Sequence, residues 1–248
     1  MKKLLLILLI IGSIICLLVG CNGVTPPVNG GEGEDEGETV DRVVLVEFYT
    51  VGCPNSTIAE PFIEELAEEY DRTEMILVEE RPWGTPISPG ANDRYEWYLP
   101  NPVDRSAPNT FYNGSNQRVW HGSAYYIFKS PIVNELAKDS EISITVTRSE
   151  NDGTTTLTGK IKNISNSNLD NLVINGMTFR DYFESGQRYL VKDIFKGVEE
   201  VGESLEAGAE RSFTFTLEDI HWETDQLHGV VFVQNSSTKE VFQASYVE

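Results

Sequence analysis

The hydrophobic pattern of the chain changes its period near residue 138, and this change limits the possible folds more strongly than any other feature. Before it, two apolar runs, Val43–Tyr49 and Met75–Val78, flank a segment whose apolar residues recur every three or four positions. Such runs are typical of strands covered on both faces, and the longer spacing is typical of a helix. The order strand, helix, strand predicts a βαβ unit with parallel strands. The expected helical stripe consists of Ile58, Phe62, Ile63, Leu66, Ala67 and Tyr70.

After residue 138, apolar residues alternate with polar ones. Ile142, Ile144 and Val146 would share one face of a strand, and the hairpin-type turn Asn151-Asp152-Gly153 precedes a return strand. We expect Val230–Val233 to be the most buried segment of this half. Seven strands in about 110 residues match the count and spacing of an immunoglobulin-like β-sandwich, although the cysteine pair of that fold is absent. The further candidate strands are 171–177, 188–195, 210–217, 228–234 and 239–246.

Length and charge set the number of domains and exclude one class of partner. The 210 residues from Thr39 to Glu248 are enough for two domains of about 100 residues each. We therefore predict an α/β domain at 39–137 and an all-β sandwich at 138–248. The formal charge of −20, from 19 basic and 39 acidic side chains, argues against nucleic acid as a partner because a polyanion would be repelled.

The N-terminus has the pattern of a secretory signal. Lys2 and Lys3 precede an apolar run from Leu4 to Val19, which is short for a helix crossing ~30 Å of hydrocarbon. The run ends in Leu18-Val19-Gly20-Cys21, which resembles the lipobox of bacterial lipoproteins. The resemblance implies that residues 1–20 are removed and that Cys21 receives lipid. An uncleaved N-terminal anchor is the alternative, and with either one the rest of the protein lies outside the cytoplasm.

Residues 21–38 are predicted to be a linker. Glycines, two prolines and five acidic residues fill positions 22–38, with almost nothing apolar to bury, as expected of a flexible spacer. With lipid on Cys21, the protein would be tethered to a membrane of the cell envelope. In a Gram-negative cell we expect that membrane to be the outer one.

The segment Val46–Ser56 carries the strongest chemical signal. A predicted strand runs into a short turn, and Cys53 stands where the predicted helix begins, followed by Pro54 at the first helical position. The first backbone N–H groups of a helix have no helical partner, and their partial positive charge lowers the pKa of a thiol placed there. Cys53 is therefore a candidate nucleophile in its thiolate form.

Four features around Cys53 resemble the thioredoxin superfamily. Glu47 stands six residues before Cys53, where family members carry a buried carboxylate. The sequence of the surrounding segment, Val46–Cys53, resembles that of the disulfide isomerases. Pro61 follows by eight residues, like the proline that kinks the active-site helix of the family, and Ala107-Pro108 looks like its cis-proline segment. The resemblance implies an α/β thioredoxin-like domain at 39–137 with Pro108 beside Cys53.

A second resemblance concerns the plan of the whole chain. A lipoprotein signal, a thioredoxin-like domain and a β-sandwich that ends in a segment such as 230–244 resemble bacterial outer-membrane lipoproteins of the 28-kilodalton type. This resemblance implies a place in the cell envelope.

Ser56 marks a departure from the thioredoxin pattern, because the family carries a second cysteine at this position. A serine hydroxyl cannot form a disulfide, so dithiol cycling within one chain is excluded. Monothiol chemistry remains, in which Cys53 attacks a disulfide and an outside thiol releases it, with Ser56 donating a hydrogen bond to the thiolate. In the alternative, Cys53 is inert and the chain is a non-catalytic binding or assembly module of the envelope, so the enzymatic status stays open.

Two further features have alternative interpretations. A buried Glu47 would have a raised pKa and could relay a proton, or it is a relic of the fold. The segment 81–106, rich in proline and aromatic residues, would form a lid or groove beside Cys53, or its aromatic side chains pin the segment to the domain.

No metal or cofactor site is expected. The three cysteines, at positions 16, 21 and 53, are not spaced for zinc. His121, His221 and His228 are scattered without metal-ligand or triad spacing, so we interpret them as solvated or structural. The expected partners are the membrane, through Cys21, and protein thiols or disulfides.

Overall fold

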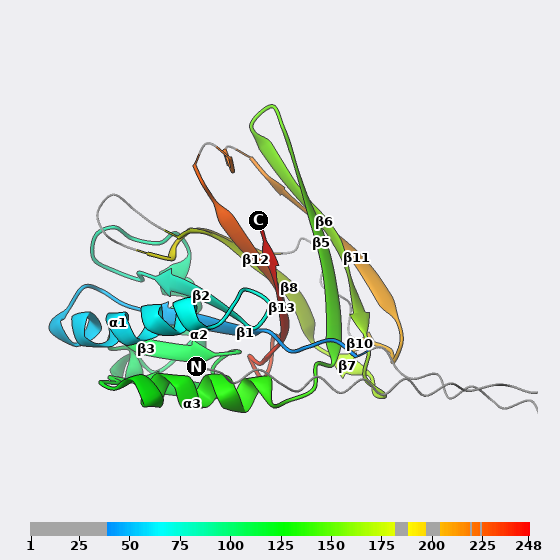
Figure 1. Ribbon diagram of the computed structural model, residues 1–248. Helices are drawn as coiled ribbons and strands as arrows, with labels where there is room; N and C mark the ends of the chain where they lie inside the picture. Colours follow the sequence, from blue (N-terminus) through cyan, green and yellow to red (C-terminus); the bar gives the residue numbers. More distant parts are fainter. Residues whose placement is uncertain (1–38, 182–187, 197–203, 219, 224) are drawn as a thin grey trace, which may run out of the picture. The chain divides into compact units, whose positions relative to one another are not determined.

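The computed structural model describes residues 39–181, 188–196, 204–218, 220–223 and 225–248, and Figure 1 shows their arrangement. The predicted signal peptide, the lipidation of Cys21 and the linker at 21–38 lie outside these residues and stay predictions. The described residues belong to one compact unit. Within the described ranges, no helix combines the length and the apolar composition that crossing a membrane requires.

The predicted βαβ unit is confirmed. β1 (Val44–Tyr49) and β2 (Met75–Glu80) are parallel neighbours, and α1 (Pro54–Glu69) connects them. Every residue of both strands is buried, as expected for their apolar residues. Burial continues past the apolar run of β2 into its two glutamates, which the hydrophobic pattern does not indicate.

The buried face of α1 differs from the predicted stripe. Ile58 is 51% exposed, so its place in the stripe is wrong. The small residues Ser56 and Ala59 are buried in its place, together with Ile63 and Leu66. Small side chains let the first turns of the helix lie close to the strands, and a search for apolar residues overlooks them.

A hairpin and two helices complete this half. β3 (Asn109–Tyr112) pairs antiparallel with β1, β4 (Gln117–Trp120) pairs antiparallel with β3, and α3 (Tyr125–Leu136) packs against α1. The segment 81–106 contains α2 (Ala91–Tyr98) and a short 3₁₀ helix, Pro102–Asp104.

The aromatic residues of α2 pin the segment 81–106 to the sheet. The ring of Tyr95 stacks on Tyr49 of β1 with centroids 4.6 Å apart, and the ring of Tyr98 lies 4.8 Å from that of Phe111. The interpretation of these aromatics as anchors is therefore confirmed.

The second half has the predicted strands. β5 (Ile142–Asn151) and β6 (Thr154–Asn163) form the expected hairpin, with Asp152 and Gly153 both in the left-handed region at φ 49° and 79°. β11 (Glu210–Leu217) pairs with β6 to complete a three-stranded sheet. β7 (Leu169–Asp170) and β10 (Ser204–Leu205) form a short extra pair.

The remaining strands join those of the first half in one sheet. β8 (Leu172–Arg180), β9 (Leu190–Lys196), β12 (His228–Asn235) and β13 (Val241–Val247) continue it in the order β13-β12-β8-β9-β2-β1-β3-β4. The strands β8, β9, β12 and β13 and the three-stranded sheet share one apolar cluster, so they pack face to face as a β-sandwich (Figure 1). Val230–Val233 are fully buried, as predicted. Its immunoglobulin-like classification stays a prediction.

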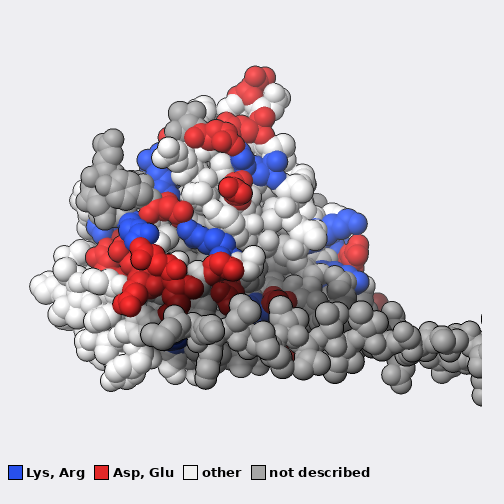
Figure 2. All heavy atoms as spheres, in the orientation of Figure 1, with Lys and Arg blue, Asp and Glu red and all other residues white. Residues whose placement is uncertain are grey.

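Acidic and basic side chains are unevenly distributed over the surface. Figure 2 shows one face of the molecule, on which Asp and Glu side chains gather into a patch with Lys and Arg side chains beside it. This pattern accords with the excess of acidic over basic residues in the chain.

The eight-stranded sheet continues through the predicted boundary between residues 137 and 138. β9 pairs in parallel with β2, along the edge of β2 that faces away from β1. The Glu79 N–H donates a hydrogen bond to the Tyr189 carbonyl at 2.8 Å. The turn between β3 and β4 touches the turn between β12 and β13 so closely that a Cβ on Gly114 would lie 1.9 Å from the Lys239 carbonyl oxygen. The division into two domains therefore stays a prediction, while the contacts join both parts.

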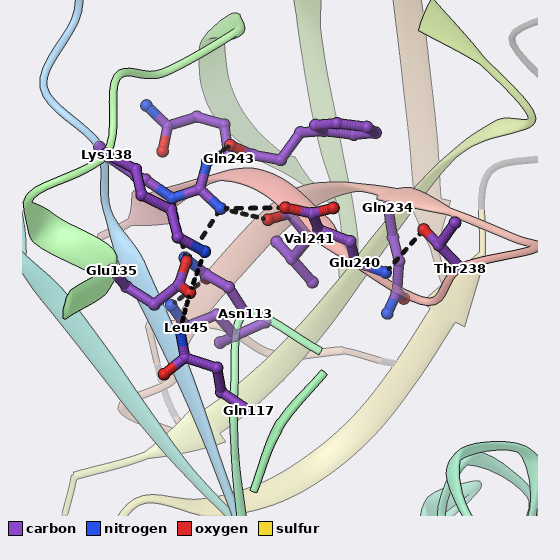
Figure 3. Close-up of polar contacts among 12 residues, drawn as sticks. Leu45, Asn113, Gln117, Glu135, Lys138, Gln234, Thr238, Glu240, Val241 and Gln243 are labelled. Atoms are coloured by element: carbon purple, nitrogen blue, oxygen red, sulfur yellow. Dashed lines mark hydrogen bonds and ion pairs between the residues drawn. The ribbon is translucent and has the colours of Figure 1, made fainter. Parts of the chain in front are cut away.

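A buried polar cluster lies where the two parts meet (Figure 3). Arg42 forms an ion pair with Glu135 of α3 at 3.0 Å and donates to the Val241 and Phe242 carbonyls of β13, each at 3.1 Å. Asn113 also donates to Glu135, at 3.1 Å. These contacts join the N-terminal segment, α3, the turn after β3 and the last strand.

Candidate functional site

Cys53 stands at the carboxyl end of β1, where α1 begins. The turn before it passes through Gly52 at φ 68°, a conformation that favours glycine, and Pro54 occupies the first turn of the helix. The first turn contains no acidic residue. In a sheet with parallel strands, the carboxyl ends of the strands and the helix N-termini border a natural binding crevice.

The Cys53 thiol is free, partly buried and hydrogen-bonded. Its Sγ lies 3.2 Å from the Oγ of Ser56, which is fully buried, and 3.7 Å from the Ala107 carbonyl oxygen. Burial raises the pKa of the Cys53 thiol, but hydrogen bonds to the sulfur from the Ser56 hydroxyl and from backbone N–H groups outweigh burial and lower the pKa. These hydrogen-bond donors favour the thiolate, whereas the Ala107 carbonyl accepts from the protonated thiol.

Pro108 lies beside this thiol. The pairing of β1 with β3 sets Tyr49 opposite Asn109 and so brings the preceding Ala107-Pro108 segment to the start of α1. The Ala107–Pro108 peptide bond is cis, as the thioredoxin resemblance implies. The structure thus brings Cys53, Ser56 and Pro108 together.

Glu47 lies apart from this group. It is fully buried, its Oε1 accepts from the Arg94 Nε at 2.5 Å, and its Oε2 accepts from the Tyr98 hydroxyl at 2.5 Å. Among the described residues, no hydrogen bond or ion pair joins Glu47 to Cys53 or Ser56. Its carboxylate serves as an anchor for α2.

A second buried carboxyl group, that of Glu80, was not predicted from the sequence. It lies opposite Tyr49 in the pairing of β1 with β2, is fully buried, and neither carboxyl oxygen makes a hydrogen bond of good geometry within the described residues. Burial raises the pKa of Glu80 well above its usual range, the charge of Glu47 raises it further, and Arg94 opposes the shift. The available signal was a pair of glutamates directly after the apolar run of β2.

His121 is the residue near Cys53 that the sequence analysis missed. Its Nε2 lies 3.1 Å from the Ala107 carbonyl oxygen, the same atom that Cys53 Sγ contacts. The sequence interpretation of His121 as solvated or structural did not foresee this, because the contact depends on how β3 and β4 pair.

The other two histidines lie elsewhere. His228 Nδ1 is hydrogen-bonded to the Tyr246 hydroxyl at 2.5 Å and its Nε2 faces Asp181 at 3.4 Å, while His221 is exposed. Within the described ranges, no three His, Cys, Asp or Glu side chains come together in a way that could hold a metal ion.

Comparisons with known proteins find solved structures of similar fold. No family model and no curated protein sequence matches the chain. HBP35 of Porphyromonas gingivalis is similar over 84% of this chain and 75% of its own, with 14% identity and a TM-score of 0.62. Protein AGR_C_4864 from Agrobacterium tumefaciens is similar over 85% of this chain and 95% of its own, with 13% identity and a TM-score of 0.54.

A third solved structure bears on the 28-kilodalton resemblance. A domain of the outer membrane lipoprotein Omp28 from Porphyromonas gingivalis overlaps 44% of this chain and 88% of its own, with 18% identity and a TM-score of 0.29. That overlap is too poor to support a conclusion. At their low identities, the first two structures show a shared fold alone, a mostly β architecture around a mixed sheet, and this fold extends through both parts of the chain.

Proposed function

We propose that this chain is a lipid-anchored, thioredoxin-like protein of the cell envelope that carries out monothiol exchange with protein disulfides at Cys53. The observation that supports it best is the meeting of three groups at the start of α1. A thiol with a lowered pKa lies beside the Ser56 hydroxyl and the Ala107 carbonyl. An activated cysteine requires partial exposure and donors to the sulfur, which the Ser56 hydroxyl and the backbone N–H groups supply. The Ala107 carbonyl accepts from the protonated thiol and marks the position of the neighbouring segment.

The proposed exchange has two steps that balance in atoms and electrons. The Cys53 thiolate attacks one sulfur of a substrate disulfide, a new S–S bond forms, and the other sulfur leaves with the electron pair as a thiolate. Because Ser56 cannot resolve this mixed disulfide, an outside thiol attacks it, takes over the substrate sulfur and returns the Cys53 thiolate. The chain itself is neither oxidised nor reduced over the cycle.

The segment before β3 supplies the proposed docking edge. An extended substrate would add to the backbone at Ala107 and Pro108 by strand addition, next to the sulfur that attacks it. We propose a structural role for Glu47, since Arg94 and Tyr98 engage its carboxylate.

The envelope location is proposed from the N-terminal sequence. The apolar run 4–19 and the lipobox ending at Cys21 support a lipid anchor, and the acidic linker 21–38 would hold the compact unit away from the membrane. In a Gram-negative cell, the proposed site is the outer membrane.

The test measures how the reactivity of Cys53 depends on pH. The full chain is treated with iodoacetamide between pH 4 and 10, and alkylation is followed at Cys53 by peptide mass spectrometry, which separates it from Cys16 and Cys21. We expect an apparent pKa below that of a free cysteine. Ser56→Ala should raise it, with a loss of about three- to tenfold in rate at pH 6, because one hydrogen bond to the thiolate is removed.

One result would decide against this function, and another against the role of Ser56 in it. A Cys53 that titrates at or above the value of a free cysteine would exclude an activated thiol. An unchanged rate in Ser56→Ala would show that the 3.2 Å contact does not stabilise the thiolate.

A second candidate function is a non-catalytic binding or assembly module. It is favoured by Ser56 in place of a resolving cysteine and by the sheet that joins the thiol-bearing part to the sandwich. Cys53→Ala separates the two functions. The module predicts that partners are captured unchanged, whereas the exchange reaction predicts that disulfide-linked complexes disappear.

A further inference from the structure

The pairing of β3 with β4 fixes His121 near the Cys53 thiol. Trp120 lies opposite Asn109, so the next residue, His121, faces Pro108 and donates its backbone N–H to the Pro108 carbonyl at 3.3 Å. Its Nε2 and the Cys53 Sγ lie 3.1 and 3.7 Å from the Ala107 carbonyl oxygen. Two atoms that share one contact in this way are at most about 7 Å apart, a distance over which a charge still acts through water.

The imidazole is held in place and can exchange protons with solvent. The Trp120 ring packs against it with centroids 4.5 Å apart, and the indole N–H of Trp120 donates to the Ser106 Oγ at 2.7 Å. His121 is exposed, so water has access to the ring. Histidine is the side chain whose usual charge change falls between pH 5 and 8.

We propose that His121 is a positioning residue for exchange at Cys53, whose protonated imidazole stabilises the neighbouring thiolate. The inference rests on the proposed function, because it concerns the same sulfur atom. A positive charge close to a thiol favours its thiolate form. A protonated His121 would thus raise the fraction of Cys53 present as thiolate by about threefold. His121 keeps its own proton during the attack, and the departing sulfur takes its proton from water.

Two charged side chains on neighbouring strand ends, Arg118 and Arg81, make contacts that do not involve His121. The guanidinium of Arg118 lies 5.9 Å from the Trp120 ring and donates to the Asp104 carbonyl. At the end of β2, Arg81 donates to Glu79 at 2.8 Å. A change at His121 leaves these groups in place, so their effects cancel when variants are compared.

The test compares alkylation rates at Cys53 in the full chain at pH 5.5 and pH 8, with iodoacetamide and peptide mass spectrometry. His121→Asn removes the charge and suits the backbone, since φ is 52° and asparagine tolerates that region. We expect it to react about threefold more slowly than the wild type at pH 5.5 and equally fast at pH 8, as befits one charge about 7 Å away.

Two further variants complete the design. His121→Lys carries its charge at both pH values, so it should match the wild type at pH 5.5 and react about threefold faster at pH 8. His221→Asn makes the same chemical change at an exposed histidine elsewhere and should alter neither rate.

The outcomes separate this inference from the proposed function. Equal slowing of His121→Asn at both pH values would mean that the side chain only holds the Ala107 segment, and no change at either pH would mean that it has no role. Both results overturn the inference while leaving Cys53 reactive. If His121→Asn fails to fold, His121→Lys at pH 8 decides alone. A wild-type Cys53 with an ordinary titration would instead defeat the proposed function.

Discussion

At the scale of single residues, Glu80 shows how burial controls protonation. Its carboxyl group is fully buried beside the ion pair of Glu47 and Arg94 and has no hydrogen bond of good geometry in the described structure. Burial and the charge of Glu47 raise its pKa, so the folded protein holds a proton there at a pH where the unfolded chain has released it. A group whose pKa is higher in the folded state contributes less to the free energy of unfolding as pH rises from its unfolded-state pKa toward its folded-state pKa.

Glu80→Gln removes this titration and is expected to stabilise the protein increasingly as pH rises above about 4.5. Relative to the variant, the wild type should lose up to about 1.4 kcal/mol of unfolding free energy for each pH unit in this window. Urea unfolding at pH 5, 6 and 7 measures the difference. Glu79, whose pKa burial raises to about 7, is present in both proteins.

The control for this prediction is Glu65→Gln, which makes the same change on the exposed face of α1. It should leave the pH dependence of unfolding unaltered. A difference between Glu80→Gln and the wild type that stays constant from pH 5 to 7 would contradict the raised pKa.

At the scale of elements, the hydroxyl group of Tyr98 adds a hydrogen-bonded link between α2 and the sheet to the ring contacts of Tyr95 and Tyr98. The Tyr98 hydroxyl donates to Glu47 and accepts from Arg94 Nη2 at 2.6 Å and from Gln234 Nε2 at 2.9 Å. Gln234 lies on β12, so this oxygen joins α2 to strands of both halves.

Tyr98→Phe removes the oxygen and leaves its buried partners short of a hydrogen bond. Such a loss destabilises a protein by about 1–3 kcal/mol, because the partners keep their desolvation penalty. Urea unfolding at pH 7 measures the change, with Tyr126→Phe, at a tyrosine that is 72% exposed, as the matched control. A loss no greater than in the control would show that the hydroxyl network does not hold α2.

The elements that the sequence predicts are those whose signal is local. β1, β2 and the hairpin of β5 and β6 have apolar runs, alternation or a turn, and all are present. α2 was not foreseen, since its buried side chains are Ala91, Arg94, Tyr95 and Tyr98 and their burial depends on distant partners such as Glu47. The place of Cys53 follows from local pattern, whereas that of His121 follows from strand register, which no short segment encodes.

At the scale of the whole molecule, the pairing of β2 with β9 and the buried cluster around Arg42 join the two halves of the chain. The change in hydrophobic period along the sequence suggests two domains, because the period depends on neighbouring residues alone. Which strand pairs with the edge of β2 depends on residues more than 100 positions away, so the period does not reveal it. The side chains of Arg42 and Glu135 are each only 2% exposed, so their ion pair is sheltered from water.

Arg42→Met is expected to destabilise the protein by about 3–5 kcal/mol, because it leaves the Glu135 carboxylate buried without its main cation. Lys138, whose side chain is 46% exposed, also pairs with Glu135. Because it keeps some positive charge beside the carboxylate, we expect a destabilisation near the lower end of this range. Adding Glu135→Gln should recover part of the loss, since the buried charge is then gone. Lys160→Met, which breaks the exposed pair with Glu210, serves as the control and should change stability by about 1 kcal/mol or less.

The same variants show whether the halves unfold together. Because Arg42 binds α3 and β13 at once, wild-type unfolding should be a single transition whose calorimetric enthalpy equals the van't Hoff enthalpy. Arg42→Met should lower the temperature of that one transition. Two transitions in the wild type would mean that 39–137 and 138–248 are independent domains in spite of the shared sheet, and an Arg42→Met protein as stable as the Lys160→Met control would mean that the cluster does not hold them together.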